Sequence, residues 1–212
     1  MPATFDQKTA LIVVDVQNDF AHPDGSLYVR DAEEIFPALE DLVARAQKAG
    51  SIIVYTKDWH PPETPHFKAQ GGIWPAHCVA GTWGAALHER VPRASPAVFI
   101  HKGQGPEDGY SAFTVIDPRT GERSQTGLAA LLRRLDVTRV VIAGLATDYC
   151  VNHTVMDALD LGFLAEVVEA AVRAVDLQPG DGARALGEMA ARGAVVVREH
   201  SDERAGAAAP SP

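Results

Sequence analysis

The stretch RVVIAGLATDYCVN, residues 139–152, is the clearest indication of the fold, because an expected buried strand and an expected helix meet within it. Its first part is short, apolar and rich in β-branched residues. It lacks the strict alternation of a half-exposed strand, so a strand covered on both faces is expected. Its last part opens a run of apolar residues at helical spacing from Val151 to Leu161, which ends at Gly162. A buried strand that leads into such a helix predicts a βαβ unit in a parallel sheet.

The same alternation of strand and helix patterns extends in both directions from this unit. Two further helical patterns end at Gly50 and Gly193, and another follows a candidate cap at Thr126. The chain is therefore expected to form an α/β fold, a three-layer sandwich around a six-stranded, mainly parallel, Rossmann-like sheet. The other expected strands are Ala10–Asp15, Ser51–Thr56, Ala97–Lys102, Leu164–Glu169 and Ala194–Arg198, and the other expected helices are Ile35–Ala46, Leu128–Leu135 and Ala183–Ala191.

The size and composition of the chain fit one globular domain. With 212 residues, of which 46% are hydrophobic, the chain can bury a sizeable core without disulfides. Residues 1–200 are expected to form this domain, and the polar, aperiodic segment Ser201–Pro212 is expected to be a disordered tail. Residues 58–96 hold almost no strand or helix pattern, yet they contain all three tryptophans. We therefore expect an ordered, functional loop there.

Charge and cysteine usage limit the classes of partner. A net charge of −9 without a cluster of Lys or Arg argues against a nucleic-acid partner. No apolar run approaches the roughly 20 residues that span a bilayer, so no membrane partner and a cytoplasmic location are expected. In that reducing compartment Cys78 and Cys150 are interpreted as free thiols, which directs attention to chemistry rather than to a disulfide scaffold.

Chemically versatile side chains follow four of the expected strands. Asp15 ends the first strand, Asp58 follows the second, Lys102 ends the third and Cys150 follows the fourth. In an open parallel sheet the ligand crevice lies beyond the carboxyl ends of the strands, so these side chains are expected to converge. Each alone has a structural explanation, such as a capping aspartate or a buried cysteine. Their position at the same edge of the sheet favours a functional site over four separate structural roles.

The residue types at this edge fit nucleophilic catalysis. Cys150 lies at the start of a helix, where the helix dipole and the Lys102 ammonium are expected to lower the thiol pKa. Asp15 would accept the thiol proton and return it to a leaving amine. Backbone amides around Ala146 and Cys150 would then form an oxyanion hole.

Two histidines offer a competing base. His153 shares a helix with Cys150, three residues later, which leaves it little freedom to reach both the nucleophile and a leaving group. His101 precedes Lys102 on the same strand and must point to the opposite face. Asp15 is therefore the favoured base.

Six motifs in order carry a resemblance to a known family. They are LIVVDVQNDF, TKDWHPP, IWPAHCV, VFIHKG, GYSAF and GLATDYCV, which fall between Leu11 and Val151. Together they resemble the nicotinamidase (pyrazinamidase) branch of the isochorismatase-like cysteine hydrolases. The resemblance implies a six-stranded parallel α/β fold, the catalytic triad Asp15, Lys102 and Cys150, and a cis peptide between Leu145 and Ala146. It also implies a pocket for a flat heteroaromatic ring, lined by Phe20, Trp74, Tyr110 and Leu145.

The segment TKDWHPPETPHF, residues 56–67, supplies candidate metal ligands. Asp58 and His60 are one residue apart, and the resemblance adds His77 as a third ligand. An aspartate with two or three histidines suits Zn²⁺, Fe²⁺ or Mn²⁺, and one divalent ion is expected, zinc foremost. Two roles stay open for His66, that of a further metal ligand and that of a solvated histidine in the loop. The resemblance implies a structural role for Cys78.

The implied activity is hydrolysis of nicotinamide to nicotinate and ammonia through a cysteine thioester, a step in NAD salvage, with pyrazinamide as a further substrate. The metal would hold the pyridine ring in place. Three alternatives stay open: an amidohydrolase for a ureido or carbamoyl substrate, a hydrolase with a metal-bound hydroxide, and a metal-binding or redox-sensing protein. The oligomeric state also stays open, with a homo-oligomer as one alternative.

Overall fold

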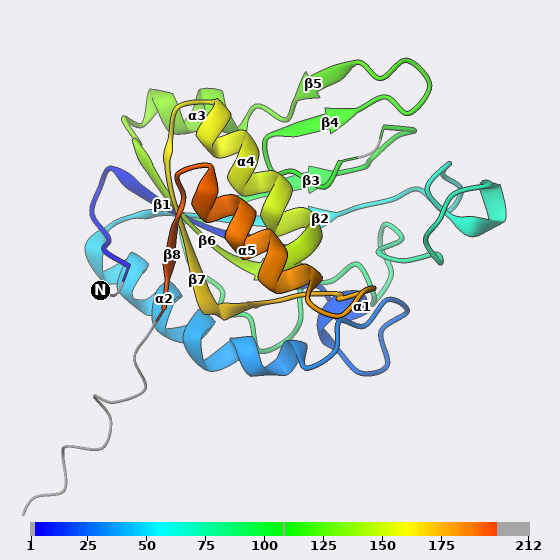
Figure 1. Ribbon diagram of the computed structural model, residues 1–212, viewed down its shortest axis with the longest axis horizontal. Coiled ribbons are helices and arrows are strands. Elements are labelled where there is room, and N and C mark those ends of the chain that lie inside the picture. The colour runs from blue at the N-terminus through cyan, green and yellow to red at the C-terminus, as the bar shows by residue number, and fades with distance from the viewer. Residues whose placement is uncertain (1–2, 108, 199–212) are drawn as a thin grey trace, which may run out of the picture.

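The computed structural model describes residues 3–107 and 109–198 and is built around one six-stranded sheet (Figure 1). The strand order is β3-β2-β1-β6-β7-β8, and every pair of neighbours is parallel. The predicted sheet is thus confirmed. The predicted tail, residues 201–212, lies outside the described residues. The strands are β1 Thr9–Val14, β2 Ile52–Asp58, β3 Val98–Lys102, β6 Arg139–Leu145, β7 Leu164–Arg173 and β8 Val195–Val197.

Helices cover both faces of the sheet, as the apolar strands require. On β1, Leu11 and Val13 face the core shared with α2, whereas Ala10, Ile12 and Val14 face the core shared with α3, α4 and α5 (Figure 1). Each fully buried Val, Leu or Ile side chain contributes about 1.5–3 kcal/mol relative to an exposed one. The result is the predicted three-layer sandwich. The helices are α2 Phe36–Ala49, α3 Leu128–Arg134, α4 Asn152–Asp160 and α5 Asp181–Ala191.

The ends of two helices test the predicted caps. Gly50 closes α2 in the left-handed conformation, at φ +70°, as predicted for a glycine in this position. The residue that immediately precedes α3 is Gly127, at φ +90°, and not Thr126. The Thr126 hydroxyl nevertheless accepts a hydrogen bond from the N–H of Leu128, at 3.3 Å. The predicted cap is therefore wrong by one position, although the side chain contacts the helix start.

Several short elements have no counterpart in the prediction. They are α1 Asn18–Ala21, the 3₁₀ turns η1 Ala32–Ile35 and η2 Lys68–Gln70, and an antiparallel hairpin of β4 Thr114–Ile116 and β5 Arg123–Gln125. Elements of three or four residues are too short to show a period. The strand β7 also runs four residues beyond its predicted end at Glu169, past an irregularity in its pairing with β6.

The long connection between β2 and β3 is ordered by pairing of its own backbone. His60 pairs with Val79 and Phe67 pairs with Trp74, while Leu87 pairs with Gln17 beside β1. These pairings fold the connection back over the carboxyl ends of the strands. The expectation of an ordered loop is therefore confirmed. None of the helices in residues 3–107 and 109–198 is long and apolar enough to cross a membrane.

Candidate active site and metal centre

Four strand ends bring the predicted reactive residues together. Asp15 directly follows β1 at φ +48°, Asp58 ends β2 and Lys102 ends β3. Cys150 lies in η3 Thr147–Val151, a single π-helical turn between β6 and α4. All four side chains are buried. The parallel register therefore gathers them at one edge, as the sequence predicts.

Lys102 lies at the centre of this group. Its ammonium donates hydrogen bonds to Asp15 Oδ2 at 2.6 Å, to the Tyr110 carbonyl at 2.9 Å and to the Gly109 carbonyl at 3.3 Å. These three acceptors engage its three hydrogens, so Asp58 Oδ1 lies 3.0 Å from Nζ without accepting a hydrogen bond. Burial alone would lower the pKa of Lys102. The two carboxylates outweigh burial and hold that pKa well above its ordinary value.

The protonation state of Cys150 differs from the expectation. Its sulfur and one oxygen each of Asp15 and Asp58 lie within 4.8 Å of one another. Burial raises the pKa of the Cys150 thiol well above its ordinary value; Lys102 opposes this effect and the two carboxylates reinforce it. The predicted lowering of the thiol pKa is wrong, because one ammonium is shared between two carboxylates in a dry site. Burial likewise raises the pKa of Asp15, partly offset by Lys102.

The two histidines weighed as alternative bases lie away from this centre. His101 stacks on Trp59, with ring centroids 4.9 Å apart and planes 10° from parallel. It therefore points away from Lys102, as strand alternation predicts. His153 is exposed on α4, and its ring lies 5.1 Å from that of Tyr110. Neither histidine lines the pocket described below.

Asp58, His60 and His77 form a buried cluster with the composition of a metal site. One ligand atom of each lies within 4.8 Å of the others; Asp58 Oδ2 is 3.7 Å from His60 Nε2 and 4.0 Å from His77 Nε2. The Nδ1 atoms of the histidines instead contact backbone carbonyls, of Gly103 at 3.1 Å and of Pro75 at 2.8 Å. Donation from Nδ1–H leaves both Nε2 lone pairs directed at Asp58, which is the tautomer that metal-binding histidines adopt.

The charges in this cluster also suit a divalent cation. Burial by itself raises the pKa of Asp58, but Lys102 and the two histidines outweigh it and hold that pKa far below its ordinary value. Burial lowers the pKa of His77, which favours the neutral ring. An ionised carboxylate and neutral imidazoles are the forms that bind metals. The residues present therefore fit a divalent ion.

His66 lies beside this cluster but is not a member of it. Its ring centroid is 5.5 Å from that of His60, and its Nε2 contacts the Glu107 carbonyl at 3.0 Å. In the part of the chain that the structure describes, two groups have ligand atoms within 4.8 Å of one another, Asp58 with His60 and His77 and also Asp15 with Asp58 and Cys150, and His66 belongs to neither. His66 is buried, so the alternative of a solvated loop histidine is wrong.

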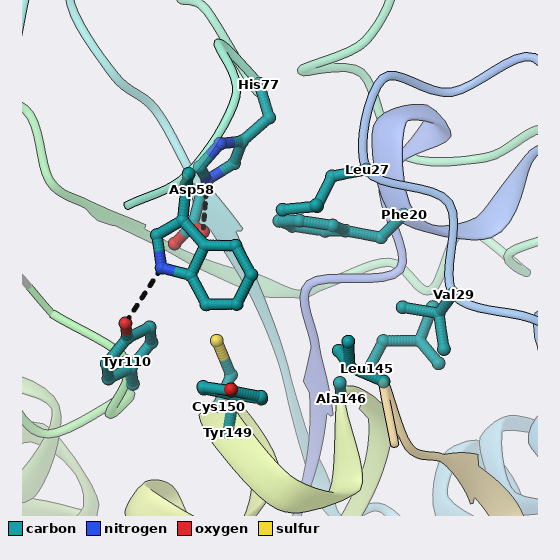
Figure 2. A pocket seen from close by; sticks show the side chains of 12 residues that line it. Phe20, Leu27, Val29, Asp58, His77, Tyr110, Leu145, Ala146, Tyr149 and Cys150 are labelled. Atoms are coloured by element: carbon teal, nitrogen blue, oxygen red, sulfur yellow. Dashed lines mark hydrogen bonds and ion pairs between the residues drawn. The ribbon is translucent and has the colours of Figure 1, made fainter. Parts of the chain in front are cut away.

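A pocket of about 410 Å³, including its mouth, connects the cysteine to the metal cluster. Figure 2 shows the Cys150 sulfur pointing into it, with Tyr110 on one side and Phe20 and Leu27 on the other. Trp74 Nε1 donates a hydrogen bond to the Tyr110 hydroxyl at 3.0 Å. All four predicted lining residues are present, namely Phe20, Trp74, Tyr110 and Leu145, together with Asp58, His77, Ala146 and Cys150. The peptide between Leu145 and Ala146 is cis, as the resemblance implies.

Four lining residues were not predicted: Leu27, Val29, Tyr149 and Val175. Leu27 and Val29 lie in an irregular segment after α1, and Val175 lies just beyond β7. Apolar residues in such segments carry no periodic signal. Tyr149 could have been found, because an aromatic residue next to the candidate nucleophile is a reasonable pocket residue.

Comparison with known proteins identifies the family. The Isochorismatase domain pattern matches residues 9–201. The chain is 37% identical over 203 residues to the nicotinamidase of Escherichia coli, which covers 88% of this chain and 93% of that protein. The structure superposes on the pyrazinamidase of Pyrococcus horikoshii in complex with zinc with a TM-score of 0.80 and 38% identity, covering 91% of this chain and 99% of the other. It superposes on a protein from L. infantum in complex with nicotinate with a TM-score of 0.83 and 33% identity, covering 93% and 96%. The chain therefore belongs to the isochorismatase family, among relatives that are nicotinamidases and pyrazinamidases.

Proposed function

We propose that this protein is a nicotinamidase, which hydrolyses nicotinamide to nicotinate and ammonia in NAD salvage and also deaminates pyrazinamide. One observation carries the proposal: the buried Cys150 and two members of the buried Asp-His-His cluster, Asp58 and His77, line the same apolar pocket. A cysteine alone would fit many hydrolases. The adjoining cluster provides a second fixed point within the same pocket.

The pocket walls suit a planar heteroaromatic ring. Phe20 lies on one side, and the hydrogen-bonded pair of Trp74 and Tyr110 lies on the other. Aromatic side chains contribute large contact areas with definite orientations. In our proposal Leu145 completes the wall next to the cis peptide. Such a ring would place its carboxamide carbon at the Cys150 sulfur, where a fixed geometry lowers the entropic cost of attack.

The first half of the proposed reaction forms a thioester. As the Cys150 sulfur bonds to the carboxamide carbon, the thiol proton moves to Asp15, whose raised pKa suits it to accept a proton. The carbonyl oxygen gains negative charge, and the backbone amides of Ala146 and Cys150 donate hydrogen bonds to it. Asp15 then protonates the amide nitrogen, the C–N bond breaks and ammonia leaves. Lys102 holds Asp15 in place throughout.

The second half regenerates the enzyme. A water molecule attacks the thioester carbon and gives one proton to Asp15. The C–S bond then breaks, the sulfur regains a proton from Asp15, and nicotinic acid leaves; its carboxyl proton passes to solvent, which gives nicotinate. Protonation of the departing sulfur is consistent with the raised pKa of the Cys150 thiol, because that pKa makes the free thiolate unfavourable.

We propose zinc as the resident metal, with iron or manganese as further candidates. Asp58, His60 and His77 would hold it, and His66, whose ring lies 5.5 Å from that of His60, is the candidate for an additional ligand. When bound, the ion supplies a Lewis acid that anchors the ring nitrogen, directly or through water. Metal analysis of the purified protein tests the identity of the ion.

An ammonia-release assay with a panel of amides tests the activity. We expect turnover of nicotinamide and pyrazinamide and little of ureido or carbamoyl compounds, since the latter do not carry a carboxamide directly on a flat heteroaromatic ring. Preference for a carbamoyl compound would favour the alternative amidohydrolase.

The variant Cys150→Ala tests the chemistry. We expect it to lose ammonia release while it retains the bound metal, because Cys150 does not belong to the Asp-His-His cluster. A metal-bound hydroxide as nucleophile predicts the opposite, namely turnover that survives the mutation. Rapid acid quenching of the wild-type protein with nicotinamide, followed by mass spectrometry, should show an acyl adduct on Cys150. A redox or metal sensor would show neither turnover nor adduct.

A further inference from the structure

Asp19 is a buried carboxylate that the proposed reaction does not use. It lies on α1 immediately before Phe20, and only 8% of its surface is exposed. Its Oδ2 accepts a hydrogen bond from the N–H of Cys78 at 2.6 Å, and its Oδ1 accepts one from the N–H of Ser26 at 3.0 Å. One side chain therefore joins α1, the segment after it, and a segment 59 residues away in the sequence.

Cys78 connects the two candidate metal-binding histidines through its backbone. It follows His77 in the chain, and its carbonyl accepts the N–H of His60 at 3.0 Å. Cys78 also has a φ of +46°, in the left-handed region that costs a non-glycine residue about 1–2 kcal/mol. Such a conformation persists only where surrounding contacts impose it. The short, charge-assisted bond to Asp19 is one such contact.

Asp19 also holds one wall of the pocket, through both its side chain and its backbone. Besides the bond from Ser26, the backbone carbonyl of Asp19 accepts the N–H of Leu27 at 3.1 Å, and that of Phe20 accepts the N–H of Val29 at 2.8 Å. Leu27 and Val29 both line the pocket, and Figure 2 shows them on the same side as Phe20. Asp19 therefore connects the apolar wall to the segment that carries His77.

Gly84 keeps room for this carboxylate. A Cβ atom placed on Gly84 would lie 2.1 Å from Asp19 Oδ2, far closer than side-chain atoms approach one another. The Gly84 carbonyl also accepts the N–H of Asp19 at 3.0 Å. The carboxylate is thus enclosed closely enough that even one added methyl group must displace it.

We propose that Asp19 is a positioning residue. Through Cys78 it fixes His60 and His77 for a divalent cation, and it also fixes the pocket wall that contains Leu27 and Val29 for the substrate ring. An aspartate suits this role because each of its oxygens accepts one amide hydrogen. Asparagine offers a single oxygen, and its NH₂ group would face the remaining N–H. The part that concerns the ring rests on the proposed function, whereas the part that concerns the cation does not.

Zinc retention by the variant Asp19→Asn tests the proposal. The full chain is loaded with Zn²⁺, and zinc transfer to a chromogenic chelator is followed. We expect about a 10- to 100-fold loss of zinc affinity, the usual effect of removing a group that orients metal ligands. With Co²⁺ in place of Zn²⁺, we expect the visible absorption spectrum to change as the histidines shift. In the presence of saturating metal, KM for nicotinamide should also rise.

Asp148→Asn is the matched control. The Asp148 carboxylate also accepts two amide hydrogens, from Val175 and Asp176 at 2.9 Å each, and it supports the wall of the pocket that contains Val175. We expect this variant to raise KM and to keep the zinc affinity and cobalt spectrum of the wild type. The comparison separates the loss of any carboxylate that accepts two backbone amide hydrogens from the loss of Asp19 in particular.

Zinc retention needs no turnover, so it decides the proposal even if the wild type does not hydrolyse nicotinamide. Wild-type zinc affinity and cobalt spectrum in a folded Asp19→Asn protein would overturn it. If that variant does not fold, Gly84→Ala takes its place, because it keeps the carboxylate and displaces it from Cys78. Wild-type zinc affinity in Gly84→Ala would then overturn the proposal equally.

Discussion

The charge of Lys102 holds the site together at the residue scale. Its ammonium lies between Asp15 and Asp58, in contact with both and without exposure to solvent. In Lys102→Met the two carboxylates would repel each other in a buried site. We expect a loss of about 3–5 kcal/mol in the free energy of unfolding, measured by urea denaturation, together with loss of turnover.

Lys57→Met is the control for this prediction. Lys57 lies on the same edge of the sheet, but its ammonium packs over the Trp59 ring at 4.2 Å and is partly exposed. Its replacement by methionine should lower the free energy of unfolding by about 0.5–1 kcal/mol. Equal stability of Lys102→Met and the wild type would contradict the role that we assign to the ion pairs of Lys102.

Asp15 provides a second test at the residue scale, because its role is proton transfer. Asp15 Oδ1 accepts a hydrogen bond from the Thr56 hydroxyl at 2.6 Å, which asparagine can preserve. In Asp15→Asn the asparagine side chain should therefore keep the position of the aspartate, yet it cannot accept the thiol proton. We expect kcat to fall about 10²- to 10⁴-fold with KM little changed, since Asp15 does not line the pocket. Steady-state kinetics separate the two parameters, and an unchanged kcat would assign the base elsewhere.

At the scale of elements, the turn after β3 supports the metal cluster. Gly103 has a φ of +63°, and its carbonyl contacts His60 Nδ1. A Cβ atom on Gly103 would lie 2.5 Å from Cε1 of that ring. Gly103→Ala should therefore displace His60 and weaken zinc binding, in addition to a backbone cost of about 1–2 kcal/mol. Competition with a chelator measures the first effect and urea denaturation measures the second.

Gly121→Ala is a close match for this variant. Gly121 has a φ of +71°, and a Cβ atom there would meet no atom within 4 Å. It should show the backbone cost without the loss of zinc. Equal zinc affinity in the two variants would mean that the His60 ring tolerates the added methyl group.

Elements of different length differ in how well the sequence predicts them. The six main strands and four main helices were predictable because burial on both faces, or on one stripe, leaves a local pattern. The hairpin of β4 and β5 was not, because Arg123–Gln125 is fully exposed and has no apolar face. Asp15, Asp58, Lys102 and Cys150 could be brought together because they follow strand ends, whereas His77 and the ring pocket were implied by the family resemblance alone. The thiol pKa of Cys150 was mispredicted because burial in the folded site raises it, an effect that a local sequence pattern does not show.

At the scale of the whole molecule, strand order determines where the site lies. The chain builds β1, β2 and β3 in one direction across the sheet and then returns to place β6 on the other side of β1. Ligand crevices in open parallel sheets form where the order reverses in this way. Asp15 follows β1 and Cys150 follows β6, so the proposed base and nucleophile flank the reversal. This relation required the strand order, which periodicity does not reveal.

His88 links the stability of the whole molecule to pH. Its backbone N–H donates a hydrogen bond to the Val16 carbonyl just beyond β1. Its ring lies 4.7 Å from that of Phe36 on α2, and the ring Nδ1 accepts a hydrogen bond from the backbone N–H of Arg90. Burial lowers the pKa of His88, and nearby His22 and Arg90 act in the same direction against Glu89 and Glu33. The folded protein therefore binds fewer protons here than the unfolded chain.

The stability that neutral His88 contributes should be complete above about pH 6.5 and should decline as the pH falls toward the lower pKa of the folded state. In His88→Asn the side-chain oxygen can still accept the Arg90 N–H, but it does not titrate. We therefore expect urea denaturation between about pH 7.5 and about pH 5.5 to show a smaller loss of stability in this variant than in the wild type. Parallel pH curves for the two proteins would mean that protonation of His88 does not oppose folding.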